Sequence, residues 1–416
     1  MTDGPSNGSK PKLLLLIPEL LTGGAARVFR NQADAFAASF AVDEAVFDEA
    51  HGMDFAAGRP VISLHDALTK GTLRAPLNLL RRSYRLRQVK RERSTDVTIS
   101  HLDGAHRVNI LSGGRDLKVL VVHGSLTHDR SLRGLRGVVT RRLVVPLLYN
   151  RADRIVTVSR DLIGELAGLG VRRERMSVIN NAVDACSIEA CARATMAQQE
   201  RALFGGPPVL VTTSRLHAAK NPLRLLDMFA ALRRRRPARL LLIGDGPLRE
   251  TAVGQAESLG LRTFAAWRDE FQPADCDVCF FGARENPFPY ICASDLFLLP
   301  SLWEGFPMSL CEALACGVPA VAADCPTGPR EILAPATSSP ARPIEAPERA
   351  EYGMLMPLLE RETSVAIWVE MLVQLLDNKT ERARLGSAGK IRIQDFSAAR
   401  IFPKWHQLID ELLAEH

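Results

Sequence analysis

Short apolar runs alternate with amphipathic stretches along the first 180 residues of the chain. Helical periodicity, as at residues 27–38, fills most of the gaps between runs. The runs have strand length and are Leu13–Ile17, Val42–Phe47, Val61–Leu64, Asp96–Ser100, Lys118–His123, Arg154–Ser159 and Met176–Ile179. Continuous apolar strands alternating with helices are typical of a parallel sheet covered on both faces. We therefore predict a doubly wound α/β domain.

The same alternation begins again after Gly205-Gly-Pro-Pro208. The expected strands there are Val209–Thr213, Leu240–Ile243, Val278–Phe281 and Leu296–Leu299, with helices at Pro222–Arg234 and from Pro307 onward. The sequence thus predicts two similar Rossmann-like domains. Their expected limits are a tail at 1–11, an N-terminal domain at 12–185, a linker at 186–206, a C-terminal domain at 207–395 and a final amphipathic helical segment at 396–416.

Composition narrows the class of protein. The 416 residues are 46% hydrophobic and 24% charged, as in ordinary globular proteins. No apolar run approaches the roughly 18 to 20 residues of a membrane span, and the polar start does not resemble a signal peptide. All eight cysteines lie between Cys186 and Cys325, without the spacing of a secreted disulfide framework. We expect a cytoplasmic protein with free thiols.

The net charge of +6 is concentrated in the first 150 residues, which hold eight more basic than acidic side chains. Two arginine-rich clusters in this region contain interleaved Leu, Val and Tyr residues. This pattern predicts amphipathic helices suited to an anionic membrane surface. Solvated helix faces are the alternative. The first cluster is Arg74, Arg81, Arg82, Arg85, Arg87, Lys90, Arg91 and Arg93, and the second is Arg130, Arg133, Arg136, Arg141 and Arg142.

The strongest local pattern is Glu304-Gly-Phe-Pro-Met-Ser-Leu-Cys-Glu312, directly after a predicted strand. Pro307 suits the first position of a helix, so the amides of Met308, Ser309 and Leu310 would form an anion site. Glu312 would lie about 7.5 Å along that helix. Carboxylates accept hydrogen bonds from paired hydroxyls, so the pattern suits a sugar, a diphosphate and a ribose. Two unrelated glutamates are the alternative.

A second pattern, Ser214-Arg-Leu-His-Ala-Ala-Lys-Asn-Pro222, follows the strand predicted at Val209–Thr213. Ligands of open parallel sheets bind at the carboxyl ends of strands, which is where this loop would place Arg215 and Lys220. Their charges could stabilise a diphosphate leaving group. A solvated basic loop is the alternative.

Two weaker patterns, a glycine pair and a histidine, could also contribute to a ligand site. Gly23-Gly24 between strand and helix would let the backbone approach a phosphate, but such turns also arise for steric reasons. His123 ends a predicted strand, where it could hydrogen-bond a sugar or a reacting hydroxyl. The His101/His106 and His123/His128 pairs could be metal ligands, but ordinary polar loops explain them as well.

Two patterns near residues 275–279 resemble metal-binding motifs. Asp275-Cys-Asp277 matches D-x-D and Cys276-x2-Cys279 is half a zinc site, yet both precede a strand. We therefore expect neither pattern to hold a metal.

Taken together, these residues resemble glycosyltransferase family 4, the retaining nucleotide-sugar enzymes of the GT-B fold. The elements that carry the resemblance are Gly23-Gly-Ala-Ala-Arg-Val28, residues 214–222, Ile243-Gly-Asp-Gly-Pro247, and Glu304 with Glu312 ahead of Ala315-Cys-Gly-Val-Pro319. Two further phrases, Asn286–Tyr290 and Asp324–Glu331, are similar to members that build bacterial surface polysaccharide or lipid-linked oligosaccharide.

The resemblance implies a fold and a set of roles. Two Rossmann-like domains would face each other across a cleft, with the C-terminal helix crossing back to the first domain. Catalytic roles fall on Glu304, His123, Arg215 and Lys220. Donor binding falls on Gly23, Gly24, Arg215, Lys220, Glu304, Phe306, Met308, Ser309, Leu310 and Glu312. Family members often carry Glu where this chain has Ala26.

The resemblance implies transfer of a hexose or N-acetylhexosamine to a saccharide or lipid-linked saccharide acceptor at the inner face of the plasma membrane. The donor would be a nucleotide sugar, with a UDP-sugar favoured over a GDP-sugar. It would be the co-substrate, with no bound metal and no other cofactor. An epimerase or phosphorylase on the same fold, and a non-catalytic nucleotide-sugar-binding subunit, are the alternatives. Nucleic-acid binding is not expected, because the basic clusters lack stacking aromatics beyond Tyr84.

Overall fold

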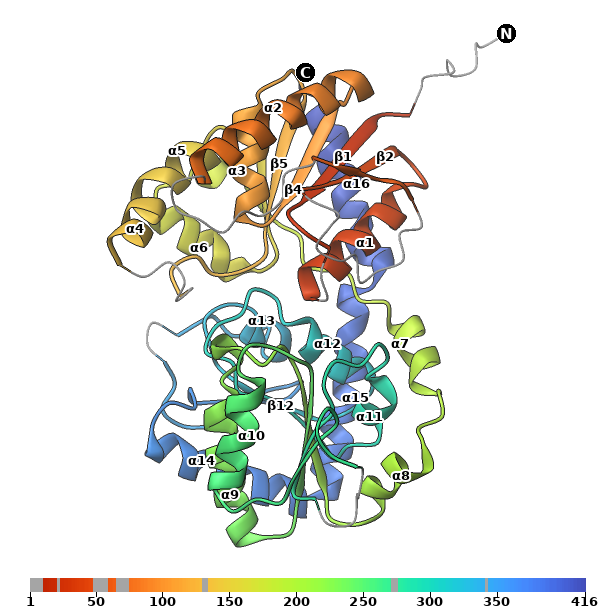
Figure 1. Ribbon diagram of the computed structural model, residues 1–416, viewed down its shortest axis with the longest axis vertical. Helices are drawn as coiled ribbons and strands as arrows, with labels where there is room; N and C mark the ends of the chain where they lie inside the picture. The colour runs from red at the N-terminus through yellow and green to blue at the C-terminus, as the bar shows by residue number, and fades with distance from the viewer. Residues whose placement is uncertain are drawn as a thin grey trace. The chain divides into compact units, whose positions relative to one another are not determined.

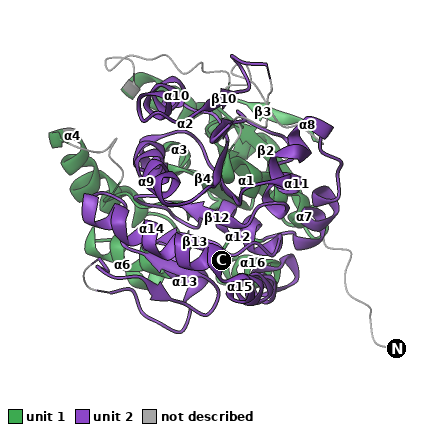
Figure 2. Cartoon of the chain, turned by 90° about the horizontal axis from the view of Figure 1, so that it is seen from below, with its two compact units in different colours: residues 1–182, 401–416 green, residues 183–400 purple. Residues whose placement is uncertain are grey.

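The computed structural model describes residues 10–20, 23–47, 59–64, 75–128, 134–270, 276–340 and 343–416. The chain forms two compact units (Figure 2). Residues 1–182 and 401–416 make the first and residues 183–400 the second.

In the described residues the first unit contains one seven-stranded parallel sheet in the order β3-β2-β1-β4-β5-β6-β7. Its strands are β1 (Lys12–Ile17), β2 (Ala41–Val46), β3 (Val61–Ser63), β4 (Val97–His101), β5 (Leu117–Val122), β6 (Arg154–Thr157) and β7 (Met176–Val178). All seven predicted strands are present to within a residue or two. The central ones are almost wholly buried, which explains the apolar runs of β1 and β5.

Helices cover this sheet (Figure 1). They are α1 (Gly24–Phe36), α2 (Ala75–Arg93), α3 (Asp103–Ser112), α4 (Gly134–Val139), α5 (Val145–Tyr149) and α6 (Arg160–Gly168). A π-helical turn, Thr140–Val144, joins α4 to α5 without a break. Because Pro146 has no N–H and its ring opposes the carbonyl four residues back, a regular α-turn would be disrupted here.

Helix α2 carries most of the first basic cluster. Its arginines at 81, 85, 87, 91 and 93 are exposed, whereas Arg82 lies over the Phe47 ring at 4.5 Å. Lys90, which the sequence pattern assigns to this basic surface, is instead buried. Its Nζ lies 2.8 Å from Asp116 and donates to Asn109 Oδ1 and Ser112 Oγ. Burial lowers the pKa of Lys90 to about 8.

The second basic cluster is only partly within the described residues. Arg142 is exposed and Arg141 is half-buried. Arg74, Arg130 and Arg133 lie outside the described residues, as does the side chain of Arg136.

The described part of the second unit has an eight-stranded sheet in the order β10-β11-β9-β8-β12-β13-β15-β14, parallel except for the β14–β15 pair. The strands are β8 (Val209–Thr213), β9 (Arg239–Ile243), β10 (Thr263–Ala265), β11 (Val278–Phe280), β12 (Leu296–Leu299), β13 (Ala320–Ala323), β14 (Glu348–Arg349) and β15 (Met354–Met356). The four predicted strands are confirmed. The other four, β10, β13, β14 and β15, were missed.

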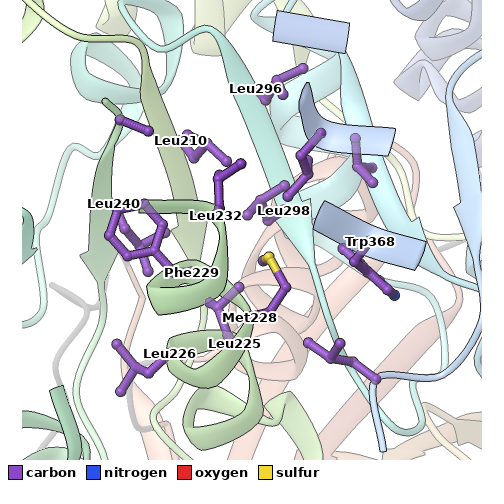
Figure 3. Packing of buried hydrophobic residues seen from close by; sticks show 14 of the residues in the cluster. Leu210, Leu225, Leu226, Met228, Phe229, Leu232, Leu240, Leu296, Leu298 and Trp368 are labelled. Carbon is purple, nitrogen blue, oxygen red and sulfur yellow. The ribbon is translucent and has the colours of Figure 1, made fainter. Parts of the chain in front are cut away.

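The helices of the second unit include several that the sequence pattern did not resolve. They are α7 (Ala185–Ala192), α8 (Gln198–Arg201), α9 (Pro222–Arg235), α10 (Arg249–Ser258), α11 (Phe288–Cys292), α12 (Met308–Ala315), α13 (Pro329–Leu333), α14 (Glu362–Asp377) and α15 (Lys379–Ile393). Figure 3 shows the main core, where Phe229 and Met228 of α9 pack near Trp368 of α14 and the leucines of β8, β9 and β12. Apolar residues spaced three or four apart on α9 supply one side of it.

The last helix, α16 (Ala398–Ala414), has one buried face that includes Ile401, Trp405 and Ile409. Trp405 meets Phe36 of α1 edge to face at 5.9 Å between ring centroids. The helix thus packs on the first unit, although it follows the second in sequence, as the resemblance implied.

We predict that Lys90→Met lowers the free energy of unfolding by about 3 kcal/mol, because the buried Asp116 carboxylate loses its nearest cation. Lys118, at 3.5 Å, compensates only in part. Urea denaturation followed by circular dichroism measures the change. Arg87→Met is the matched control, since it removes an exposed charge from the same helix. Equal losses in the two variants would contradict the assignment.

Candidate active site

Four neighbouring strands of the second unit end at one edge of its sheet. They are β9, β8, β12 and β13, which pair in that order. Because the strands are parallel, the loops at their carboxyl ends gather at the same edge, where open α/β sheets bind ligands. The two predicted site loops, 214–221 and 300–307, follow the adjacent strands β8 and β12. The structure therefore brings them together.

The centre of this edge is an ion pair between the two loops. Lys220 Nζ donates to both carboxylate oxygens of Glu304 at 2.6 Å, and Ser301 Oγ donates to Glu304 Oε1 at 2.7 Å. Glu304 is only 8% exposed, whereas the Lys220 side chain is 26% exposed. A cation and a hydroxyl thus satisfy the hydrogen-bonding capacity of this buried carboxylate. The site presents one partly accessible cation over a fixed carboxylate.

Asn221 sets the position of Lys220. It adopts a left-handed conformation with φ 53°, which Asn tolerates better than most residues, and its Nδ2 donates to the Leu359 carbonyl at 2.8 Å. The Leu302 amide donates to the Ala219 carbonyl at 2.8 Å, which ties the two loops together. Sequence reasoning missed Ser301 and Asn221 as supporting residues, although Asn221 stands next to Lys220 and ahead of a proline.

A third loop, after β13, supports Glu304 from its other side. The Glu304 amide donates to the Pro326 carbonyl at 3.2 Å, and Thr327 Oγ1 donates to the Glu304 carbonyl. Gly328 has φ +95°, and a Cβ there would come within 2.6 Å of Pro307. The Thr-Gly-Pro sequence is thus needed for close packing behind the Glu304 loop.

A fourth loop, after β9, holds the segment that carries Arg215. The amides of Ser214 and Leu216 donate to the carbonyls of Ile243 and Asp245 at 3.0 Å. A Cβ on Gly244 would lie 2.0 Å from the Ser214 carbonyl oxygen, and one on Gly246 would lie 2.5 Å from that of Leu216. These glycines therefore serve loop-to-loop packing.

Arg215 is exposed, and in the described residues it forms no ion pair with Glu304 or any other carboxylate. Its loop is fixed by the backbone, but its guanidinium remains open to a ligand. Two of the four charged side chains that we expected to converge, Lys220 and Glu304, are thus in contact.

The helix after Glu304 differs slightly from the prediction. Pro307 precedes α12 as its cap, with ψ 97°, and the helix begins at Met308. The Leu310 amide donates to the Pro307 carbonyl at 3.1 Å, which closes the first turn. This corrects the expectation that the Leu310 amide points freely out of the helix, because a tight 3₁₀-type bond satisfies it.

The remaining predicted donor residues are placed as follows. Met308 and Ser309 are half-buried at the start of α12, and Glu312 is buried farther along it. Phe306 is buried and meets Phe396 edge to face at 5.0 Å.

In the first unit, Gly23 and Gly24 are exposed at the start of α1, with no atom within 4 Å of a Cβ built on Gly23. Thr22, which precedes them, lies outside the described residues. Ala26 is buried in the same helix, so its small apolar side chain packs inward.

Three histidines of the first unit are not solvated loop residues, because His101 and His106 are buried and His123 contacts His101, whereas His128 is exposed in the loop after β5. His101 ends β4, and its Nδ1 lies 2.8 Å from Nε2 of His123, which follows β5. His106 Nδ1 lies 3.0 Å from Ser100 Oγ. Burial lowers the pKa of His123 to about 4 and that of His106 to about 3, and it lowers the pKa of His101 well below 6.5. All three are therefore neutral at pH 7.

Among the described residues, no group of three or more His, Cys, Asp or Glu has the arrangement of a metal site. Asp277 is engaged by Arg233 at 2.7 Å and Arg262 at 3.1 Å. Asp275, the other half of the D-x-D pattern, lies outside the described residues. All eight cysteines are free thiols.

Comparisons with known proteins agree with this geometry. Residues 22–185 match the family described as Glycosyltransferase Family 4, and residues 207–350 match Glycosyl transferases group 1. An uncharacterized glycosyltransferase of Methanocaldococcus jannaschii is 24% identical over 377 residues, or 84% of this chain and 87% of that protein.

Two further matches add a named enzyme and a solved structure. The N-acetylgalactosamine-N,N'-diacetylbacillosaminyl-diphospho-undecaprenol 4-alpha-N-acetylgalactosaminyltransferase of Campylobacter jejuni is 23% identical over 264 residues, 63% of this chain and 61% of that enzyme. The crystal structure of Anabaena HepE in complex with UDP and glucose has the same fold, with a TM-score of 0.70, 20% identity and coverage of 98% and 100%.

Two α/β units built on mainly parallel sheets give the chain the GT-B fold. The chain belongs to the glycosyltransferases, with a Glycosyltransferase Family 4 domain followed by a Glycosyl transferases group 1 domain. The fold class and family expected from the motifs are confirmed.

We predict that Gly246→Ala destabilises the second unit by about 1–3 kcal/mol and lowers activity, because the added methyl would displace the Leu216 backbone and with it Arg215. Gly254→Ala is the matched control, since that glycine lies in α10 with nothing within 4 Å of the added atom. It should stabilise the protein by about 0.5–1 kcal/mol. Thermal melts and activity assays of the two variants measure the changes in stability and activity. Unchanged stability and activity in Gly246→Ala would contradict the packing role.

Proposed function

We propose that the chain is a retaining glycosyltransferase of polysaccharide biosynthesis. It transfers a hexose or N-acetylhexosamine from a nucleotide sugar to a saccharide or lipid-linked saccharide. A UDP-sugar is favoured over a GDP-sugar as the donor. The observation that carries the proposal is the Lys220–Glu304 pair at the carboxyl edge of the sheet. The printed names of relatives support the substrate classes, because they include a transferase to a diphospho-undecaprenol saccharide and a lipopolysaccharide 1,6-galactosyltransferase.

The proposed division of labour follows from charge. Lys220 and the exposed Arg215 hold the donor diphosphate and offset the negative charge that it gains as the sugar leaves. Glu304 accepts hydrogen bonds from sugar hydroxyls, with Phe306 and the start of α12 beside it. Glu312 binds the ribose. Residues 12–185 bind the acceptor, and residues 207–395 bind the nucleotide sugar. Gly23 and Gly24 contact the donor phosphate, and His123 contacts the transferred sugar.

A balanced double variant tests the site. Lys220→Met with Glu304→Gln removes both charges, so no unpaired ion is left in a buried position. We expect transfer to fall by about 100-fold or more while the melting temperature stays near that of the parent protein. Product mass spectrometry with a panel of UDP- and GDP-sugars and a lipid-linked acceptor measures transfer.

Lys379→Met is the matched control, because it removes one exposed charge from the same unit. Unchanged transfer in the double variant would overturn the site. Conversion of a nucleotide sugar without an acceptor would point instead to an epimerase.

We also propose that the first unit docks on an anionic membrane surface. Along the helical segment 134–149, exposed apolar side chains recur every three or four residues beside Arg142. They are Leu135, Val138, Val139, Leu143 and Leu147. Helix α2 similarly exposes Leu77, Leu80 and Tyr84 near Arg81 and Arg85. Apolar side chains mixed with arginines suit the boundary of an anionic bilayer. No helix among the described residues is long and apolar enough to span one.

Sedimentation with vesicles containing phosphatidylglycerol tests this docking. We expect binding at low salt, where each arginine near the surface adds about 1 kcal/mol, and weaker binding at high salt. Leu135→Asp with Leu143→Asp should reduce binding. Ile391→Asp changes an equally exposed apolar residue of the second unit and should not. No binding at low salt would remove docking and leave catalysis untouched.

A further inference from the structure

The contact between His101 and His123 has the geometry of an in-plane hydrogen bond. The Nδ1–Nε2 distance is 2.8 Å, the ring planes differ by 25°, and the ring centroids are 5.0 Å apart. At that nitrogen–nitrogen distance, a centroid separation this long means that the rings lie end to end. One proton must lie between the two nitrogens, on one residue or the other.

The environment of His101 decides which residue carries that proton. His101 is fully buried, and its Nε2 has no hydrogen-bond partner among the described residues. The buried Phe29 ring packs against it edge to face at 5.3 Å. If His123 donated, the single proton of a neutral His101 would reside on Nε2, as a buried N–H without a partner. An unpaired acceptor is tolerated better than an orphaned N–H, so the proton of His101 belongs on Nδ1.

His123 must then hold its own proton on the opposite side of its ring. Its Nε2 accepts from His101, and a neutral imidazole carries only one proton, so Nδ1 is protonated. The side chain is partly exposed, and His101 is its one hydrogen-bond partner in the described part of the chain. An N–H donor, rather than a lone pair, therefore faces outward.

We propose that His101 is a positioning residue that fixes the Nδ1–H tautomer of His123, so that His123 donates a hydrogen bond to a ligand oxygen and does not act as a base. The ligand part rests on the proposed function, in which His123 faces the transferred sugar. Such a donor suits a sugar hydroxyl or another oxygen that becomes more negative during transfer, and it leaves proton acceptance to another group.

Two-bond ¹H–¹⁵N correlation spectra of the full chain, labelled with ¹⁵N-histidine, report the tautomer directly. At pH 7.5 we expect a pyrrole-type Nδ1 and a pyridine-type Nε2 for His123, assigned by loss of these signals in His123→Asn. His101→Phe should shift His123 toward the Nε2–H form. His101→Asn should restore the original form, because the Asn amide nitrogen occupies the position of Nδ1. A wild-type Nε2–H form, or a tautomer unaffected by His101→Phe, would overturn the proposal.

Kinetics supply a second measurement. His101→Phe should lower kcat about 10- to 100-fold, as when a partner that orients a functional histidine is removed, and His101→Asn should recover most of it. Equal losses in both variants would indicate a purely structural role and overturn the proposal. If the chain showed no transfer at all, the proposed function would fail while the spectra still decided the tautomer.

Discussion

The parallel pairing of β9, β8, β12 and β13 is the constraint on which the candidate site depends. It sends four loops that are far apart in sequence to one edge of the sheet. Backbone hydrogen bonds then join each loop to its neighbour, as in the bond from the Leu302 amide to the Ala219 carbonyl. Lys220 and Glu304 meet because their loops are already fixed, so the pair forms without further ordering of the backbone.

Close backbone approach is the second feature that supports this edge. Gly244, Gly246 and Gly328 stand where any Cβ would collide with a neighbouring loop. Their absence of a side chain lets the loops bearing Arg215 and Glu304 pack against supporting loops without a gap. Glycine patterns that look like phosphate-binding turns thus allow loops to pack closely here, and these packed loops position Arg215 and Glu304.

The two units treat buried polar groups in different ways. In the second unit, the Lys220–Glu304 pair is partly open to solvent, as a ligand site requires. In the first unit, Lys90 and Asp116 are sealed between helices and sheet, where they fix the position of α2. The histidine group lies between these cases, since His101 and His106 are buried while His123 reaches the surface. Exposure at one end of a buried network is what makes such a group available for chemistry.

The apolar runs predicted the strands well, because strands buried on both faces are mostly apolar, as at Leu13–Ile17. They missed Thr263–Ala265 and Met354–Met356, which are strands only because neighbouring strands supply their hydrogen bonds. Charged residues after strands indicated Lys220 and Glu304, because the ends of parallel strands gather at one edge. Ser301 lies three residues before Glu304 in the same loop, whereas the supports from Asn221 and Thr327 could not be predicted, since each depends on which segments become neighbours. The same holds for Lys90, which the sequence assigns to a cationic surface and the packing of α2 against α3 buries. The sequence alone determined the two-domain pattern and the charged side chains. Tertiary structure decided which charges pair and which nitrogen of His123 carries a proton, because these depend on contacts between segments distant along the chain.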